Sequence, residues 1–263
     1  MIGQEPGSYP EDAERQKAAM VLGGSAQRRM RRFWRSFPHA PRCKLCHRPF
    51  AGPGGAAMRL LNLGPWPGNP KYCRGCFKAL YQQRTGAEVE CTLLFADVRE
   101  STTLAEQIRP AEFRRLLDGF YRVAFEVLIA DDAFVDKFVG DEVIGIFLPV
   151  MTEGRHARVA IHAGEQLLRR MRQETGEAVL PIGIGVNTGV AYVGAVGTDE
   201  HVEFTALGDE VNVTARLAGA AAAGELLATE STIRAAGLDA AGLERRELAL
   251  KGKSATTRVV VLR

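Results

Sequence analysis

The 263-residue sequence lacks long apolar runs. No stretch of about 18 consecutive apolar residues occurs, so no membrane-spanning helix is predicted. The N-terminal stretch MIGQEPGSYPEDAERQ is polar and acidic, without the basic flank and apolar centre of a secretory signal. No internal repeat or low-complexity segment dominates. These absences predict a cytoplasmic protein, and 46% hydrophobic with 25% charged residues predicts a packed core.

Positive and negative charges are unevenly distributed along the chain. Residues 1–90 contain 15 Lys and Arg against 6 Asp and Glu, a net charge of +9. Residues 91–263 contain 19 against 25, a net charge of −6. Two parts of opposite charge predict two modules. The basic part could contact an acidic partner such as nucleic acid or a lipid surface; the alternative is that its charges only confer solubility.

The basic part divides further by composition. We expect residues 1–40 to be a flexible lead-in with a basic helical stretch, and residues 41–85 to be a small module rich in Gly, Pro and Cys. Four of the five cysteines form two CxxC pairs, Cys43 with Cys46 and Cys73 with Cys76. In a cytosolic chain this spacing indicates a metal rather than disulfides, and four thiolates suit a structural zinc ion. Free thiols or a redox pair are the alternatives.

His47 and Cys91 receive different interpretations. His47 directly follows the first CxxC pair and could replace one cysteine as a ligand, but it is better interpreted as a surface histidine. Cys91 stands at the start of an apolar run, so it is expected to be a small buried apolar side chain.

From residue 88 to 263 the apolar pattern predicts strands and helices in turn. VECTLLFADV predicts a buried strand, and residues 102–130 predict helix, with a second helix starting at Pro110. Residues 133–147 predict two strands joined by a tight turn at 139–141. The remaining expected elements are a helix at 154–174, two strands within 180–196 joined around 187–189, a helix at 208–223, and strands near 225–229 and 244–262. This order predicts an α+β fold with a ferredoxin-like split βαβ core.

Two aspartates stand at the ends of neighbouring expected strands. Asp97 ends the first strand, beside a helix start rich in hydroxyl groups, and Asp141 lies at the tip of the hairpin. In a ferredoxin-like core these two positions converge. Paired carboxylates beside a phosphate-binding loop suit two Mg²⁺ ions that also bind substrate phosphates. The alternatives are a helix-capping Asp97 and a turn residue Asp141.

A second candidate pair lies in TALGDEVNVTAR. Asn212 and Arg216 are four residues apart, so they share one helix face. An amide and a guanidinium fork on one face suit a sugar and a phosphate. The alternative is a surface asparagine with a surface salt bridge.

Five motifs together resemble the catalytic domain of the class III adenylate and guanylate cyclases, over about residues 91–263. They are FADVRESTTLAE, DKFVGDEVIGIF, GVNTGVAYVGAVG, FTALGDEVNVTARL and ELALKGKS. The resemblance implies a nucleotidyl cyclase domain, here expected at residues 88–263. It implies that Asp97 and Asp141 bind two Mg²⁺ or Mn²⁺ ions, and that Asn212 orients the ribose while Arg216 holds phosphate.

The resemblance also implies how substrate is selected. Lys137 and Thr205 match the residues that recognise the purine, and Lys251 matches the lysine that grips the triphosphate. Guanine-selective relatives carry a carboxylate and a cysteine at the two base positions, so ATP is the expected substrate and cyclic AMP the product. In the family's head-to-tail dimer each site takes residues from both chains, and this chain carries every part. A homodimer with two complete sites is therefore expected.

One departure concerns Glu100, which stands where the family often has a small residue in the phosphate loop. A carboxylate pointing inward there would repel the triphosphate. Glu100 thus favours a regulatory module that binds a nucleotide or partner without turnover. Two other interpretations also stay open: a cyclase that uses GTP or a pyrimidine nucleotide, and a zinc-containing nucleic-acid-binding protein.

Overall fold

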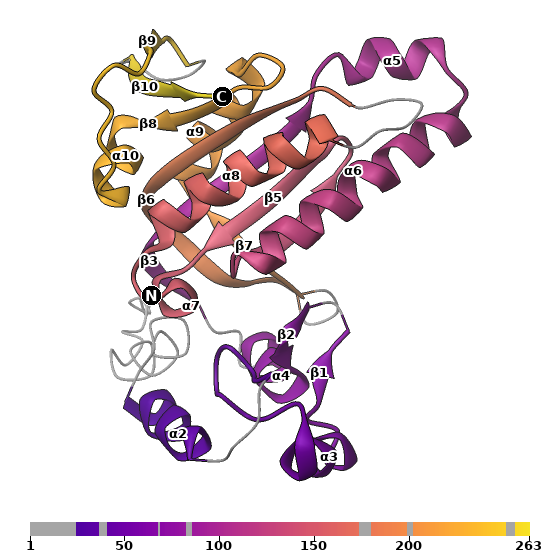
Figure 1. The fold of residues 1–263 in the computed structure, drawn as a ribbon, viewed down its shortest axis with the longest axis vertical. Coiled ribbons are helices and arrows are strands. Elements are labelled where there is room, and N and C mark those ends of the chain that lie inside the picture. The colour runs from indigo at the N-terminus through magenta and orange to yellow at the C-terminus, as the bar shows by residue number, and fades with distance from the viewer. Residues whose placement is uncertain are drawn as a thin grey trace, which may run out of the picture. The chain divides into compact units, whose positions relative to one another are not determined.

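The computed structural model describes residues 25–36, 41–67, 69–82, 86–173, 180–198, 202–250 and 256–263 (Figure 1). The chain forms two compact units, Met1–Val89 with Tyr192–Thr205, and Glu90–Ala191 with Ala206–Arg263. The boundary at residue 89 lies next to the change in sequence pattern at residue 88. Among the described residues, no helix is both long and apolar enough to cross a bilayer.

The first unit contains short elements around the four cysteines. They are α2 (Ser25–Arg35), α3 (Gly52–Leu60), β1 (Pro65–Trp66), β2 (Asn69–Cys73) and α4 (Arg74–Gln82). β1 and β2 pair antiparallel. Phe50, Met58 and the fully buried Tyr72 provide a small apolar core beside the cysteines. The basic helix expected in residues 1–40 corresponds to α2.

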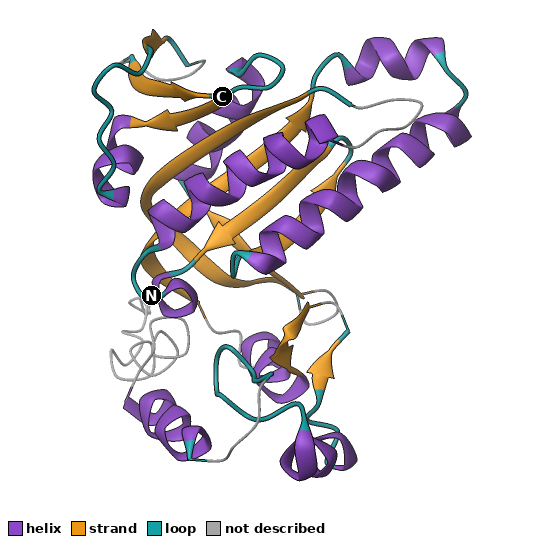
Figure 2. Cartoon of the chain, viewed as in Figure 1, coloured by secondary structure: helices purple, strands orange, loops and turns teal. Residues whose placement is uncertain are grey.

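Eight further strands, between residues 86 and 262, build one large sheet (Figure 2). Its strands are β3 (Gly86–Val98), β4 (Phe134–Val139), β5 (Glu142–Phe147), β6 (Ile182–Gly197), β7 (Val202–Leu207), β8 (Leu226–Thr229), β9 (Arg245–Leu248) and β10 (Thr257–Leu262). The order is β4-β5-β3-β6-β8-β10-β9, with β7 paired to β6. Because β5 lies antiparallel between β3 and β4, those two strands run the same way with a third strand between them. This is the split βαβ arrangement, so the predicted ferredoxin-like core is confirmed.

Helices cover both faces of this sheet. They are α5 (Ser101–Gln107), α6 (Pro110–Ala130), α7 (Pro149–Thr152), α8 (His156–Gln173), α9 (Asp209–Ala220) and α10 (Glu230–Ala236). α6 and α8 lie side by side across one face, as Figure 1 shows, and enclose the main core with residues such as Leu94 and Val260. α9 packs on the other face against Leu227 and Val259. Neighbouring strand residues point to opposite faces, so β8 and β10 contribute to both cores.

The prediction of two strands joined around Asn187 is wrong. Residues 182–197 form one continuous strand, β6. The sequence Asn-Thr-Gly is typical of a turn, but here Asn187 is buried, and its side chain donates to Glu210 and accepts from Thr229. Tertiary hydrogen bonds therefore keep this segment extended. The structure also adds α7 and α10, which the sequence pattern did not predict.

Cys91 is buried as expected, with 1% of its surface exposed. Burial raises the pKa of its thiol to about 12, so the thiolate is scarce at neutral pH. This cysteine is a structural residue of β3.

Glu225 joins the start of β8 to the edge of the sheet. Its carboxylate accepts two hydrogen bonds of 2.8 Å from Arg246, one of 2.9 Å from Arg263 and one of 3.1 Å from the backbone N–H of Ala222. The bonds from Arg246 contribute most to lowering the pKa of Glu225 from 4.5 to about 2. A carboxylate whose pKa is lowered by folding stabilises the protein above its unfolded pKa, and this contribution is lost as pH falls towards 2.

We expect Glu225→Gln to lower the free energy of unfolding by about 2 kcal/mol at pH 7. The variant should also lose less stability than the wild type between pH of about 4.5 and about 2. Urea unfolding at several pH values measures both effects. Glu247→Gln is the matched control, because its partner Arg258 is 67% exposed and surface pairs contribute at most about 1 kcal/mol. Equal losses for the two variants would contradict the assignment.

Candidate active site and metal centre

Asp97 and Asp141 are brought together by the pairing of β3 with β5. Asp97 lies opposite Glu142 in the antiparallel register, and the backbone N–H of Val98 donates to the carbonyl of Asp141 at 3.2 Å. A two-residue turn, Gly140–Asp141, joins β4 to β5, and Gly140 has φ of 61°, which suits glycine. The tight turn predicted at 139–141 is thus confirmed, and it sets Asp141 beside the end of β3.

This corner of the sheet is crowded with carboxylates. Burial raises the pKa of Asp97, and the nearby Asp141 raises it further, while Arg99 opposes the shift. Burial and the charges of Asp97 and Asp141 raise the pKa of Glu142 to about 7. Hard divalent cations prefer such carboxylate oxygens. The donor set therefore fits Mg²⁺ or Mn²⁺.

Two further residues hold the aspartates in place. Arg99 pairs with the carboxylate of Asp97 and donates to the carbonyl of Gly219 at 2.9 Å, which ties the end of β3 to the end of α9. Ser101 Oγ donates to the carboxylate of Asp141. Sequence reasoning did not select either residue. Their position directly after Asp97, in the motif FADVREST, was the available signal.

Glu100 has the backbone conformation of a glycine. It lies at the start of α5 with φ of 57°, and its side chain is exposed. A residue with a Cβ adopts this left-handed backbone region at a cost of roughly 1 kcal/mol. This gives a physical reason for the small residue that the resemblance places here.

α9 carries the second candidate pair. Asn212 is exposed and Arg216 half-buried, while Val213 and Leu217 of the same helix face the core. In the part of the chain that the structure describes, no hydrogen bond or ion pair engages the guanidinium of Arg216. The alternative of a surface salt bridge therefore finds no support there.

The position of α9 is fixed by close backbone packing and by a buried amide. A Cβ at Gly185 of β6 would lie 2.4 Å from the backbone N of Ala218, so only glycine lets α9 approach this closely. Asn187 of β6 donates to the carboxylate of Glu210 in the first turn of α9, and Thr214 Oγ1 donates to the Glu210 carbonyl at 2.6 Å. Sequence reasoning missed Asn187 and Glu210 as supporting residues, having placed Asn187 in a turn.

The three expected substrate-binding residues differ in their position in the fold. Lys137 belongs to β4, four residues before Asp141, where the pairing with β5 is irregular. Thr205 is buried in β7. Lys251 lies outside the described residues. No hydrogen bond or ion pair within the described chain joins Asn212 or Arg216 to either aspartate.

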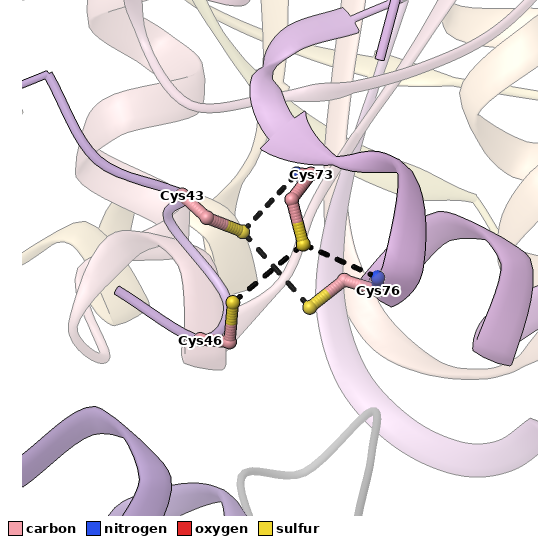
Figure 3. Close-up of side chains that lie close together, drawn as sticks. All are labelled: Cys43, Cys46, Cys73 and Cys76. Atoms are coloured by element: carbon pink, nitrogen blue, oxygen red, sulfur yellow. Dashed lines mark hydrogen bonds between the residues drawn. The ribbon is translucent and has the colours of Figure 1, made fainter. Parts of the chain in front are cut away.

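The four cysteines of the two CxxC pairs form a compact, buried cluster (Figure 3). All four sulfurs lie within 4.8 Å of one another, with Cys43 to Cys76 at 3.9 Å and Cys46 to Cys73 at 3.6 Å. Four sulfurs at 2.3 Å from a tetrahedral zinc ion are about 3.8 Å apart. The observed spacing therefore fits zinc, and none of these cysteines forms a disulfide.

The four thiols share their hydrogen bonds unequally. Hydrogen bonds from the other three cysteines, Cys43 first, lower the pKa of Cys73, whereas hydrogen bonds with Cys43 and Cys73 raise the pKa values of Cys46 and Cys76. Backbone N–H groups also donate to two of the sulfurs, from Cys73 to Cys43 Sγ at 3.2 Å and from Cys76 to Cys73 Sγ at 3.3 Å. His47 is not part of this ligand group.

The part of the chain that forms the large sheet is similar to known proteins. A family model described as the adenylate and guanylate cyclase catalytic domain matches residues 82–262. Adenylate cyclase 1 of Rhizobium meliloti (strain 1021) is 33% identical over 136 residues, which are 49% of this chain and 20% of that protein. The adenylate cyclase of Anabaena cylindrica is 30% identical over 155 residues, which are 54% of this chain and 30% of that protein. This chain thus spans less than a third of either relative.

Solved structures show the same likeness. The adenylyl cyclase CyaB from P. aeruginosa superposes with a TM-score of 0.59 at 28% identity, covering 68% of this chain and 96% of that one. The guanylyl cyclase Cya2 superposes with a TM-score of 0.63 at 24% identity, covering 67% and 92%. At that identity the second comparison shows a shared fold alone.

Proposed function

The chain belongs to the adenylate and guanylate cyclase catalytic domain family, and we propose that it converts ATP to 3′,5′-cyclic AMP and pyrophosphate at the interface of a homodimer. The observation that carries this proposal is the convergence of Asp97 and Asp141 at the β4–β5 turn. The curated relatives named adenylate cyclase support the choice of ATP.

Asp97 and Asp141 would hold two Mg²⁺ or Mn²⁺ ions. When bound, such ions lower the pKa of the attacking ribose hydroxyl and neutralise charge on the leaving phosphate. Arg99 and Ser101 orient the two carboxylates through the contacts described above. Glu142 lies opposite Asp97 in the register and, with a pKa raised to about 7, is only partly ionised at neutral pH.

Asn212 and Arg216 act in this proposal on the reacting part of ATP. The Asn212 amide hydrogen-bonds the ribose and fixes its orientation, and the Arg216 guanidinium pairs with phosphate as negative charge develops. Arg216 suits this task because no described residue accepts a hydrogen bond from its guanidinium, so its five N–H donors can bind a ligand. Lys251 holds the far end of the triphosphate.

Lys137 and Thr205 select the base in this proposal. An ammonium donates to N1 of adenine, and a threonine hydroxyl accepts from the exocyclic amine. Guanine presents a protonated N1 and a carbonyl instead, so Lys137 would meet a donor. An unpaired polar group in a closed pocket costs about 1–3 kcal/mol.

We therefore expect a preference for ATP over GTP of at least about tenfold in kcat/KM. Purified protein is incubated with Mn²⁺ or Mg²⁺ and each nucleoside triphosphate, and cyclic products are identified by mass spectrometry. Lys137→Glu with Thr205→Cys should reduce this preference, because a carboxylate accepts from guanine N1. Arg169→Glu makes the same charge change on the exposed surface of α8 and should leave the ratio unchanged.

The outcomes separate the remaining interpretations. Equal use of ATP and GTP by the wild type would show that Lys137 and Thr205 do not discriminate the bases. Binding of nucleotide without any cyclic product, in either metal, would favour a regulatory module and would implicate Glu100 in the phosphate loop.

We also propose that Cys43, Cys46, Cys73 and Cys76 hold one structural zinc ion. The sulfur separations and the burial of all four cysteines support it. Four thiolates leave no open coordination position, so the ion would stabilise the module rather than take part in chemistry.

Protein purified without chelators should contain about one zinc per chain by elemental analysis. Cys73→Ser should lose most of it, whereas the control Cys91→Ser should retain it, because Cys91 lies outside the cluster. Chelation should unfold residues 41–85 first, since metal binding and folding are coupled. Wild-type protein free of zinc, yet folded in this region, would rule out the assignment.

A further inference from the structure

The N-terminal part of the sequence contains a long stretch without any acidic residue. Between Glu14 and Glu88 there are 15 Lys and Arg and no Asp or Glu. Residues 41–82 alone contain seven of these cations. Four thiolates around a dication would subtract only about two charges, so the cysteine module remains strongly cationic. Charges of either sign would make this stretch soluble, whereas a stretch with positive charges alone favours an anionic partner.

A groove of about 740 Å³ lies in this module beside the second CxxC pair. Trp66 and Phe77 line it with their rings stacked, 3.6 Å between centroids and 12° between planes. Phe77 stacks on the indole, and Trp66 remains half-exposed where it lines the groove, so part of its ring is open to a planar group. Two exposed cations, Arg74 and Lys78, line the same groove.

The groove residues are held by the fold of the module. Arg74 donates to the side chain of Asn62 at 2.8 Å, which fixes the guanidinium at the groove wall. A Cβ at Gly75 would lie 2.8 Å from Arg48 Nη1 and from Leu63 Cδ2. Glycine at this position therefore lets the side chains of Arg48 and Leu63 pack directly against α4. Arg74 and Lys78 are four residues apart on α4, and therefore share one helix face.

We propose that this groove binds single-stranded nucleic acid, with a base stacked on Trp66 and adjacent phosphates paired with Arg74 and Lys78. A single strand presents a planar base beside every phosphate, whereas an acidic peptide carries its anions without a ring at each step, and the bases of a duplex are already stacked on each other. Aromatic platforms flanked by cations are how single strands are bound without sequence preference. This inference is independent of the cyclase reaction.

The test uses the full chain and labelled single-stranded oligonucleotides of RNA and DNA of mixed sequence, followed by fluorescence anisotropy. Raising the salt concentration from about 50 to about 200 mM should weaken binding roughly 50-fold if about four phosphates are contacted. Trp66→Ala should weaken binding by about tenfold. The salt slope, which is the slope of the logarithm of the binding constant against the logarithm of the salt concentration, should stay unchanged because stacking carries no charge. Trp66→Phe should restore most of the affinity, which separates stacking from a folding defect.

Arg74→Gln with Lys78→Gln should weaken binding and reduce the steepness of the salt slope by about 1.4. Arg114→Gln with Arg122→Gln is the matched control, since it removes two exposed cations from α6 and should change affinity less than about twofold. The proposal is overturned if the two pairs of variants behave alike, or if Trp66→Ala binds as the wild type does. Equal binding of duplex DNA, polyglutamate or anionic vesicles would also overturn it, as would full competition by free ATP or cyclic AMP.

Discussion

Asp97→Ala and Asp141→Ala are each expected to lower cyclase turnover by about a thousandfold or more, because metal ions supply several kcal/mol of transition-state stabilisation. Each variant removes a carboxylate that the proposed ions need, and leaves the other aspartate with Glu142, which lies opposite Asp97 in the register. Cyclic AMP formation in Mn²⁺ and in Mg²⁺ measures the loss.

The fold should survive both substitutions. Asp97 lies among like charges, and burial already disfavours its carboxylate, as its raised pKa indicates. Its removal costs the pairing with Arg99 but relieves repulsion with Asp141 and Glu142. We expect the free energy of unfolding to change by less than about 1 kcal/mol.

Asp118→Ala provides the matched control for lost charge. Asp118 lies on α6, is 54% exposed and forms an ion pair with Arg114 one helical turn away. It should keep activity within about twofold, as exposed pairs contribute little. Activity near that of the wild type in Asp97→Ala or Asp141→Ala would reject the two-metal assignment.

The sequence was informative wherever burial sets the pattern of apolar residues. The continuous apolar run of β3 follows from burial of both its faces, and the three- and four-residue spacing in α6 and α8 follows from packing one helix face against the core. The tight turn before β5 was visible because glycine marks a positive φ. Together these elements were enough to predict the corner where Asp97 and Asp141 meet.

Sequence reasoning failed where tertiary contacts decide the conformation. Asn187 stays in a strand because Glu210 and Thr229, distant in sequence, satisfy its side chain. The short elements α3, β1 and β2 show no periodicity, since the cysteine cluster and not an amphipathic face organises them. The contacts of Arg99 with Asp97 and Gly219 join parts of the chain whose proximity no local pattern reveals.

Mixing two inactive variants, Asp97→Ala and Arg216→Ala, is expected to restore about a quarter of wild-type activity after subunit exchange. In a head-to-tail dimer one chain gives Asp97 and Asp141 to a site, and the other gives Asn212 and Arg216. Half of the dimers in an equal mixture contain both variants, and one of the two sites in such a dimer has every part.

The control for this experiment mixes Asp97→Ala with Asp141→Ala. Both residues come from the same chain in each site, so every dimer of that mixture has two defective sites and no activity should return. Recovery in the first mixture alone therefore identifies which residues come from different chains. If exchange is demonstrated with differently tagged subunits and the first mixture stays inactive, the site lies within one chain. If both mixtures recover, Asp97 and Asp141 belong to different chains, and the division of residues proposed here is wrong.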